Sequence, residues 1–225
     1  MSTVQGGQGN IVTNGLVLNL DAANPRSYAP PFNGTTWQNI APVSSSLSGS
    51  LINGVGYTGS NGGALVFDGV DGYVNLGPLS LIQTDFCISL WVRMTSIKEH
   101  YIFSTGYNSG NSIIIFDGGI WLNSADSSGQ MPGIPGISLN QIINITVTRT
   151  GPTASWYKNG ILQSTLSYSG SIATGTTYTI GWAIPRNKST AYLQGNFYLL
   201  HIYNRGLNQS EVLQNFNATR ARFGV

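Results

Sequence analysis

The chain has 225 residues, with a hydrophobic share of 41% and a charged share of only 8%. An ordinary globular protein has about 25% charged residues, and this length suits one all-β sandwich that folds as a single domain. The net charge of +2 is spread along the chain without a basic run, which argues against a nucleic-acid partner. No apolar run could span a membrane, and the single cysteine, Cys87, excludes an internal disulfide.

Residues 1–12 are rich in Gly and Gln and hold too little apolar surface to pack alone, so we expect a flexible N-terminal arm. Residues 13–225 then form the one folded domain. The N-terminus lacks the apolar core and basic start of a signal peptide. We therefore expect the protein to be made in a cytoplasm.

The first strand is expected at 15–21, before a turn-rich corner, and residues 29–62 read as loops around one short strand near 49–52. The stretch 63–74 contains two Asp-Gly steps, at Asp68 and Asp71, between strand-forming residues. Asp-Gly pairs favour tight turns, so this stretch predicts a strand, a corner and a second strand.

Short strands then recur at fairly even spacing. They are expected at 86–92, 101–104, 112–116, 120–123, 144–149, 154–157, 178–182 and 197–203, with a loop over 124–137. The Asn159-Gly160 pair predicts a type I′ hairpin turn. Many short strands separated by turn signals indicate an antiparallel sandwich and not a parallel α/β sheet.

One helix is expected, from Gln209 to Ala218. Asn208 and Glu211 have the spacing of a capping box, and Val212, Leu213 and Phe216 follow at helical intervals. We expect this helix to pack on the edge of the sandwich.

Four motifs in the right order carry a family resemblance: 63–74, the strand 86–92, the hairpin 156–160, and the strand, corner and capped helix of 201–212. Together they resemble laminin G-like domains of the concanavalin A-like lectin/glucanase superfamily, over about residues 14–224. The resemblance implies a jelly-roll-like antiparallel β-sandwich with one short C-terminal helix. That superfamily includes lectins, glycosidases and structural modules, so the fold alone does not decide the function.

A subgroup fits better. The opening 15–28, the stretch 34–37 and the ending 221–225 resemble laminin G-like domains of bacteriophage virion proteins, although residues 39–42 depart from that subgroup. The resemblance implies a non-enzymatic virion surface protein, either a capsid decoration protein or one associated with fibres. Its partners would be capsid or fibre proteins and further copies of itself, with no membrane partner. A carbohydrate-binding, lectin-like module that recognises glycans is the alternative.

A glycoside hydrolase is the least favoured function. Its two carboxyl groups must lie about 5 Å apart, or about 6.5–9.5 Å apart for inversion. The chain has two glutamates: Glu99 falls in an expected loop and Glu211 in the capping box. His201 is expected at the surface or edge of the sandwich, and nothing indicates a catalytic triad. We therefore expect no catalytic residues.

A structural calcium ion is conceivable at Asp68, Asp71 and Asp21, since calcium prefers carboxylate and carbonyl oxygens. The alternative is that these aspartates only cap turns. The loops that resemble the calcium loops of related lectins, 105–111 and 182–188, contain no acidic residue.

Sugar binding needs no metal if aromatic side chains line a groove. Four aromatic residues near expected loops are the candidates: Tyr107, Trp121, Trp182 and Tyr192. Their alternative role is in the core, since most aromatic residues of a sandwich this size are buried.

Overall fold

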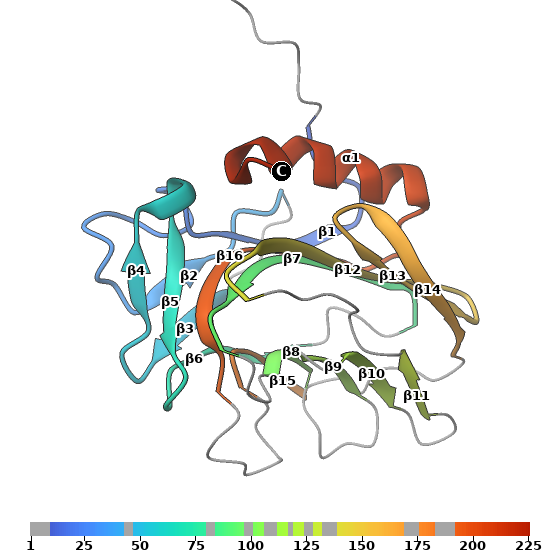
Figure 1. Ribbon diagram of the computed structural model, residues 1–225, viewed down its shortest axis with the longest axis horizontal. Helices are drawn as coiled ribbons and strands as arrows, with labels where there is room; N and C mark the ends of the chain where they lie inside the picture. The colour runs from blue at the N-terminus through green and yellow to red at the C-terminus, as the bar shows by residue number, and fades with distance from the viewer. Residues whose placement is uncertain are drawn as a thin grey trace, which may run out of the picture.

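The computed structural model describes residues 10–42, 47–79, 84–96, 101–105, 112–116, 119–123, 128–131, 139–168, 176–182 and 192–225. Within these ranges, sixteen strands form two antiparallel sheets, and one α-helix follows near the C-terminus (Figure 1). This arrangement confirms the predicted jelly-roll-like sandwich. No helix in these ranges is long and apolar enough to cross a membrane.

The first sheet is built around a long central strand, β16 (Gln194–Tyr203). β16 pairs on one side with β7 (Phe86–Met94), and on the other side it changes partner along its length. Its first part pairs with β5 (Ala64–Asp68) and its last part with β1 (Leu16–Asp21). The remaining strands are β12 (Ile142–Thr150), β13 (Thr153–Lys158) and β14 (Ile161–Ser167) beyond β7, and β4 (Gly56–Thr58) beyond β5.

The second sheet has the strand order β11-β10-β9-β8-β15-β6-β3-β2. Its strands are β11 (Ser128–Met131), β10 (Gly119–Asn123), β9 (Ser112–Phe116), β8 (Tyr101–Ser104), β15 (Thr176–Ile180), β6 (Tyr73–Leu79), β3 (Ser48–Ile52) and β2 (Thr36–Gln38). Two of these strands, together with β4 of the first sheet, differ from or extend the predicted pattern. β11 lies in the predicted loop 124–137, and β2 and β4 were not predicted, because strands of three or four residues show little alternation.

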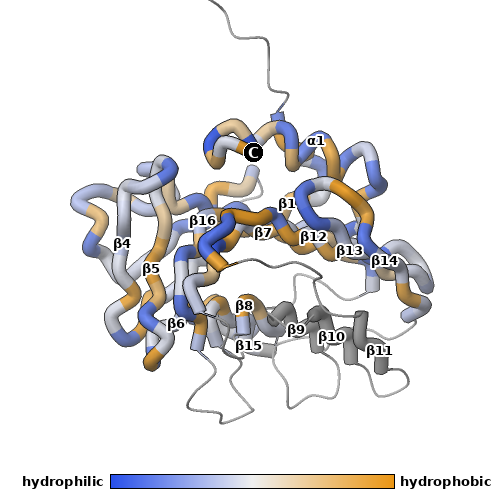
Figure 2. Tube along the Cα trace, in the orientation of Figure 1, coloured by the Kyte–Doolittle hydropathy of each residue, from blue (hydrophilic) through white to orange (hydrophobic). Residues whose placement is uncertain are grey.

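The main core lies between the two sheets and includes Trp37, Phe103, Trp156, Tyr178 and Phe197. β7 is buried along almost its whole length, on both faces, which matches its hydrophobic colour in Figure 2. A strand reads as continuously apolar only where both faces of its sheet are covered. Something must therefore cover the outer face of the first sheet.

Helix α1 (Gln209–Arg220) covers that face (Figure 1). The ring of Trp91, on β7, stacks on Phe216 with centroids 5.7 Å apart, and on Phe223 at 4.2 Å. Phe223 lies in the short 3₁₀ turn η2 (Ala221–Phe223). The predicted helix is confirmed, but its expected place on the sandwich edge is wrong, because Trp91 points outward and needs an apolar cover.

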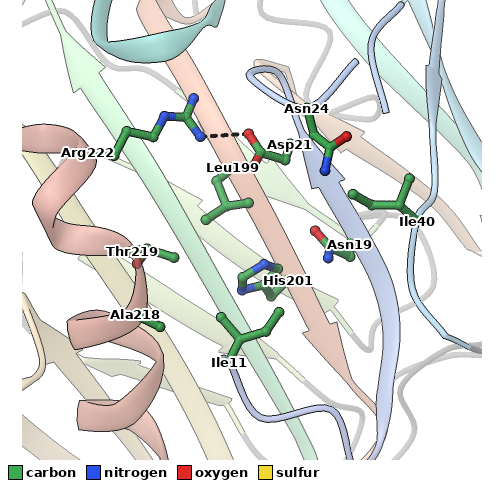
Figure 3. Close-up of a pocket in the computed structure, with 10 residues that line it drawn as sticks. All are labelled: Ile11, Asn19, Asp21, Asn24, Ile40, Leu199, His201, Ala218, Thr219 and Arg222. Carbon is green, nitrogen blue, oxygen red and sulfur yellow. Dashed lines mark hydrogen bonds and ion pairs between the residues drawn. The ribbon is translucent and has the colours of Figure 1, made fainter. Parts of the chain in front are cut away.

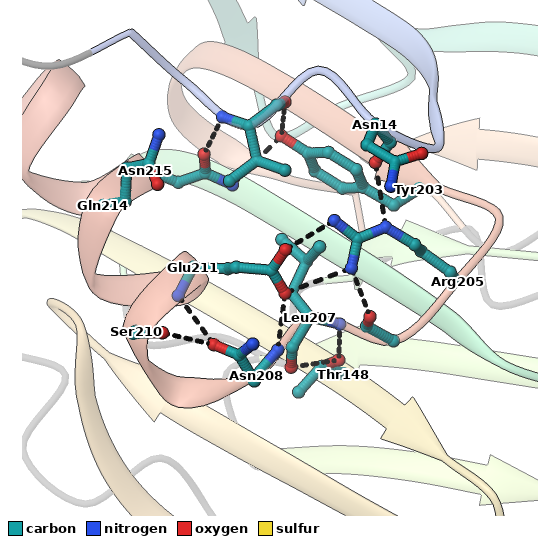
Figure 4. Close-up of polar contacts among 12 residues, drawn as sticks. Asn14, Thr148, Tyr203, Arg205, Leu207, Asn208, Ser210, Glu211, Gln214 and Asn215 are labelled. Carbon is teal, nitrogen blue, oxygen red and sulfur yellow. Dashed lines mark hydrogen bonds and ion pairs between the residues drawn. The ribbon is translucent and has the colours of Figure 1, made fainter.

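The predicted capping box is confirmed and belongs to a larger polar network (Figure 4). Asn208 Oδ1 accepts a hydrogen bond from Glu211 N, and Glu211 Oε2 accepts one from Asn208 N, each at 3.0 Å. Arg205 pairs with the Glu211 carboxylate at 2.6 Å and donates to Asn14 O at 3.0 Å. The hydrogen bond from Arg205 is the main cause that lowers the pKa of Glu211.

The described end of the expected arm, residues 10–12, packs against the C-terminal part of the chain (Figure 4). Val12 N donates to Asn215 Oδ1 at 2.8 Å, and Tyr203 Oη donates to Val12 O at 2.9 Å. Gln214 Nε2 donates to Asn10 O at 2.7 Å. Residues 1–9 lie outside the described residues.

Two smaller predictions are also confirmed. Asn159 and Gly160 both have positive φ, 51° and 75°, as a type I′ turn requires. Cys87 is buried, as expected of a strand residue, and burial raises the pKa of its thiol. A buried, protonated thiol is a poor nucleophile.

Candidate functional site

Three half-buried aromatic side chains meet at one end of the second sheet. Trp182 stacks on Tyr192 with ring centroids 5.6 Å apart and an interplanar angle of 9°. Tyr73 lies against Trp182 at 5.0 Å, with its ring tilted by 50°. We call Tyr73, Trp182 and Tyr192 the aromatic platform. All three keep part of their surface exposed, which distinguishes them from the aromatic residues of the core.

Strand pairing explains why these residues meet. Tyr73 opens β6, and Trp182 comes two residues after β15, which pairs with β6 through Ile180 and Val74. Tyr192 comes two residues before β16. Because Val74 is fully buried in the core, its neighbour Tyr73 lies on the opposite, outer face of the sheet.

The corner Asp68–Asp71 borders the platform. Burial raises the pKa of Tyr192, and the nearby Tyr73 and Asp71 raise it further. The Tyr192 phenol therefore stays neutral near pH 7 and can both donate and accept a hydrogen bond. Flat apolar rings beside hydroxyl and carboxylate groups suit a sugar, which has an apolar face of C–H groups and a polar rim of hydroxyls.

Of the four predicted sugar-binding residues, the structure brings Trp182 and Tyr192 together. Tyr107 lies outside the described residues. Trp121 falls in β10, but its side chain is also outside the described residues. Sequence reasoning missed Tyr73, although the alternation of β6, which buries Val74 and Leu76, was a signal that Tyr73 faces outward.

The three aspartates proposed for calcium do not come together. Asp21 pairs with Leu199 of β16, whereas Asp68 pairs with Gln194, five residues earlier on that strand, or roughly 17 Å at about 3.4 Å per residue. Asp21 is also ion-paired with Arg222 at 2.6 Å. Including Asp21 in a shared site was therefore wrong, because β1 and β5 pair with different parts of β16.

The remaining pair, Asp68 and Asp71, supplies a small part of the six to eight oxygens that calcium takes. Asp68 Oδ1 accepts a hydrogen bond from Val70 N at 2.9 Å, as a turn-capping aspartate does. In the part of the chain that the structure describes, no three His, Cys, Asp or Glu residues cluster as metal ligands. Calcium at Asp68 and Asp71 therefore stays a prediction.

A pocket lies on the outer face of the first sheet, beneath α1 (Figure 3). Its volume is about 250 Å³. His201 lies in it and is only 3% exposed, so the expectation of a surface or edge histidine was wrong. The reason is the same helix that covers Trp91, since α1 also covers the outward-facing positions of β16.

Comparisons with known proteins agree with this architecture. Residues 68–213, more than half of the chain, match the family model described as the concanavalin A-like lectin/glucanases superfamily. No curated protein sequence matches the chain significantly.

Similar solved structures include domain 4 of AbnA, an extracellular arabinanase from Geobacillus stearothermophilus, in complex with arabinotriose. It has 14% identity and a TM-score of 0.66, over 91% of this chain and 99% of that one. The binding domain of Paraclostridial Mosquitocidal Protein 1 has 18% identity and a TM-score of 0.71, over 91% and 52%. Trypanosoma rangeli sialidase with the inhibitor DANA has 15% identity and a TM-score of 0.61, over 92% and 33%.

This chain therefore spans almost all of the arabinanase domain, about half of the toxin domain and a third of the sialidase. At these identities the likenesses concern the fold. The two sheets, the capped C-terminal helix and the family match lead to one conclusion: the chain belongs to the concanavalin A-like lectin/glucanase superfamily.

Proposed function

We propose that this protein is a non-catalytic binding module and that the aromatic platform is its glycan-binding site. The observation that carries the proposal is the stack of Trp182 on Tyr192, with Tyr73 against it, on the outer face of the second sheet. These rings retain exposed surface, whereas the interior rings, such as Trp37, are fully buried. Partly exposed stacked rings present a flat apolar surface on which the C–H face of a sugar can lie.

The comparisons support this proposal through similar folds. The arabinanase domain, which this chain matches over nearly its whole length, was crystallised with arabinotriose. The toxin neighbour is itself a binding domain. A sandwich of this kind can thus hold a short neutral oligosaccharide without a second domain.

Four of the five acidic side chains that the structure describes are engaged in ion pairs or hydrogen bonds, which supports a non-catalytic role; the fifth, Asp71, lies near the platform. Asp21 pairs with Arg222 and Glu211 with Arg205, each at 2.6 Å. Asp85 accepts a hydrogen bond from Gly151 N at 2.9 Å, and Asp68 caps its own turn. A retaining or inverting glycosidase needs two carboxyl groups that face the sugar and are free to exchange protons. Glu99, Asp117 and Asp126 lie outside the described residues.

A glycan array followed by titration calorimetry tests the platform. We expect the native protein to bind at least one neutral glycan and Trp182→Ala to weaken that binding at least ~10-fold, which is about 1.4 kcal/mol. Tyr57→Ala is the matched control, because Tyr57 also stacks on a ring, Phe32, but belongs to β4, in the other sheet. Native protein that binds no glycan, or equal binding by Trp182→Ala, would overturn the proposal.

We also propose that this binding module acts at a virion surface, as a capsid decoration or fibre-associated protein that forms homo-oligomers. The similarity of residues 15–28, 34–37 and 221–225 to phage laminin G-like domains supports this setting, as does the low charge of the chain. The chain enters the fold at residue 10 beside α1, and β15 lies on the opposite side (Figure 1). Attachment on the α1 side would leave the platform facing outward.

Cryo-electron microscopy of purified particles tests this setting. We expect density for the sandwich at symmetric positions of the capsid or fibre, with α1 toward the particle. Particles that never carry the chain, together with a protein found only as a free monomer, would contradict it. That result would leave the glycan-binding proposal intact.

A further inference from the structure

The pocket beneath α1 is separate from the aromatic platform. It lies between α1 and the outer face of the first sheet, whereas the platform lies on the second sheet. Figure 3 shows the side chains of Asn19, on β1, and His201, on β16, next to each other, with Ala218 and Thr219 of α1 across from them. Asn19 and His201 are direct cross-strand partners, which is why both point into the same space.

Both of these side chains have hydrogen-bonding capacity that the described residues leave unused. His201 is only 3% exposed and makes no hydrogen bond with any residue that the structure describes. Asn19 Oδ1 is buried and has no hydrogen-bond partner in the described structure. A buried polar group without a partner destabilises the folded protein, so a molecule in the pocket that donates a hydrogen bond to Asn19 Oδ1 would remove that penalty. The His201 ring would give the same molecule a second bonding site.

The charges around the pocket are already balanced. Arg222 and Asp21 pair at 2.6 Å, and Arg222 also donates to Asn61 O at 2.8 Å and to Gly63 O. Burial lowers the pKa of His201 to about 4, against a small opposing effect of Asp21. The imidazole is therefore neutral near pH 7 and offers one donor and one acceptor. An ionic ligand would find no unpaired charge here.

Two further polar residues line the pocket and are already bonded: Asn24 Oδ1 accepts from Arg26 N at 3.0 Å, and Thr219 Oγ1 donates to Asn215 O at 2.9 Å. The other four lining residues are apolar. Ile11, Ile40, Leu199 and Ala218 face the same space. A pocket of about 250 Å³ is below the roughly 300–1,000 Å³ of pockets for drug-sized molecules. The occupant must be small and neutral, with both an apolar surface and groups that donate and accept. Hydroxyl groups on a carbon skeleton meet all of these requirements, because each hydroxyl is donor and acceptor at once.

We propose that this pocket binds a neutral polyol no larger than one sugar ring, with hydroxyl groups bonded to His201 and Asn19. The site needs neither the aromatic platform nor the glycan-binding proposal. Its ligand would also fasten α1 to the first sheet, because it would contact Ala218 and Thr219 on one side and the strands on the other.

Calorimetry and NMR titration with glycerol, L-arabinose, D-glucose and myo-inositol test this site, with shifts of the His201 ring signals as the local readout. Ala218→Leu fills the pocket with a residue that favours a helix. Asn217→Leu, at the exposed neighbouring position of α1, is the matched control. We expect at least one probe to bind the native protein, Asn217→Leu and Trp182→Ala alike, and Ala218→Leu to bind it at least ~10-fold more weakly.

Three outcomes would overturn the proposal. The first is that none of the four probes binds to the native protein, which would mean that the pocket holds only water. The second is that the Ala218→Leu variant binds the probe as tightly as the native protein does. The third is that Trp182→Ala abolishes probe binding while Ala218→Leu retains it, which would place the ligand on the aromatic platform. The thermal unfolding of each variant shows whether it has folded.

Discussion

The outer faces of the two sheets differ in whether their aromatic side chains are covered or partly exposed. On the first sheet, Trp91 is covered by Phe216 and Phe223, and its Nε1 donates to Thr219 Oγ1 at 3.1 Å. On the second sheet, Trp182 also stacks on a ring but keeps exposed surface. Both tryptophans lie outside the main core, and within the described part of the chain a helix covers Trp91 but not Trp182.

This contrast separates a structural aromatic cluster from a candidate binding surface. The number of ring contacts does not distinguish them, since each tryptophan has two aromatic neighbours. The exposure that remains does distinguish them, because Trp91 is 1% exposed and Trp182 is half-buried. Substitutions on the two faces should therefore change different properties, stability on one and binding on the other.

The largest effect is expected from removing Trp91. Trp91→Ala leaves a cavity beneath α1 and should lower the free energy of unfolding by about 3–5 kcal/mol, measured by urea denaturation. Trp182→Ala should lower it by about 1 kcal/mol or less, because its side chain is partly in solvent already. Equal losses from the two substitutions would remove the distinction between the faces.

The second effect concerns the pH dependence of the first-sheet face. The pKa of His201 is lowered to about 4 by burial, against about 6.5 in an unfolded chain. Between these values the unfolded state binds more protons, so stability is full above pH 6.5 and falls as the pH drops toward 4. Asp21 of β1 and Arg222 of η2, which line the same pocket, are paired with each other.

Between pH 7 and pH 4 the native protein should therefore lose about 3 kcal/mol more of its unfolding free energy than His201→Phe does. Urea denaturation of both proteins at several pH values measures this difference, and the other titrating groups cancel in it. Parallel curves for the two proteins would show that His201 is not buried in the neutral form.

The third effect concerns the network that begins α1. Glu211→Gln removes the ion pair with Arg205 and weakens the capping box, and we expect a loss of about 1 kcal/mol in unfolding free energy. The pKa of Glu211 is lowered in the folded protein, so this contribution is present near neutral pH and is lost as the pH falls through that lowered pKa. Denaturation at neutral and at acidic pH checks this; a loss that stays the same at both would contradict it.

The smallest effect tests which part of the platform binds. Tyr73→Phe keeps the ring that lies against Trp182 and removes only the hydroxyl. If ring contact provides most of the binding, glycan affinity should fall less than ~3-fold, which is about 0.7 kcal/mol. A loss as large as that of Trp182→Ala would mean that the Tyr73 hydroxyl, and not the ring surface, contacts the sugar.

Local signals in the sequence predicted much of this fold. The capping box of Asn208 and Glu211 and the Asn159-Gly160 turn involve residues close in the chain, and the structure has both. The position of α1 could not be predicted in the same way. It depends on Trp91, more than a hundred residues earlier, and on which face of β7 that side chain takes.

Less of the aromatic platform could be predicted, because its residues also come from distant parts of the chain. Trp182 and Tyr192 were candidates because they flank an expected loop, but their stacking depends on how β15 and β16 end. Tyr73 and Asp21 show why sequence alone does not predict which residues meet. Tyr73 joins the platform because β6 pairs with β15. Asp21 lies away from Asp68 and Asp71 because β1 pairs with a different part of β16.

The contacts of residues 10–12 have a mechanical consequence. Val12 is bonded to Tyr203 and Asn215, and the chain then enters β1, whose one strand partner among the described residues is β16. A pulling force applied through residue 10 would reach the centre of the first sheet directly and would load the β1–β16 hydrogen bonds along the strands. If the protein is tethered through this end, its resistance to shear depends on the β1–β16 pair, on the contacts of Val12, and on the hydrogen bonds of β1 to Asn39 and Ile40.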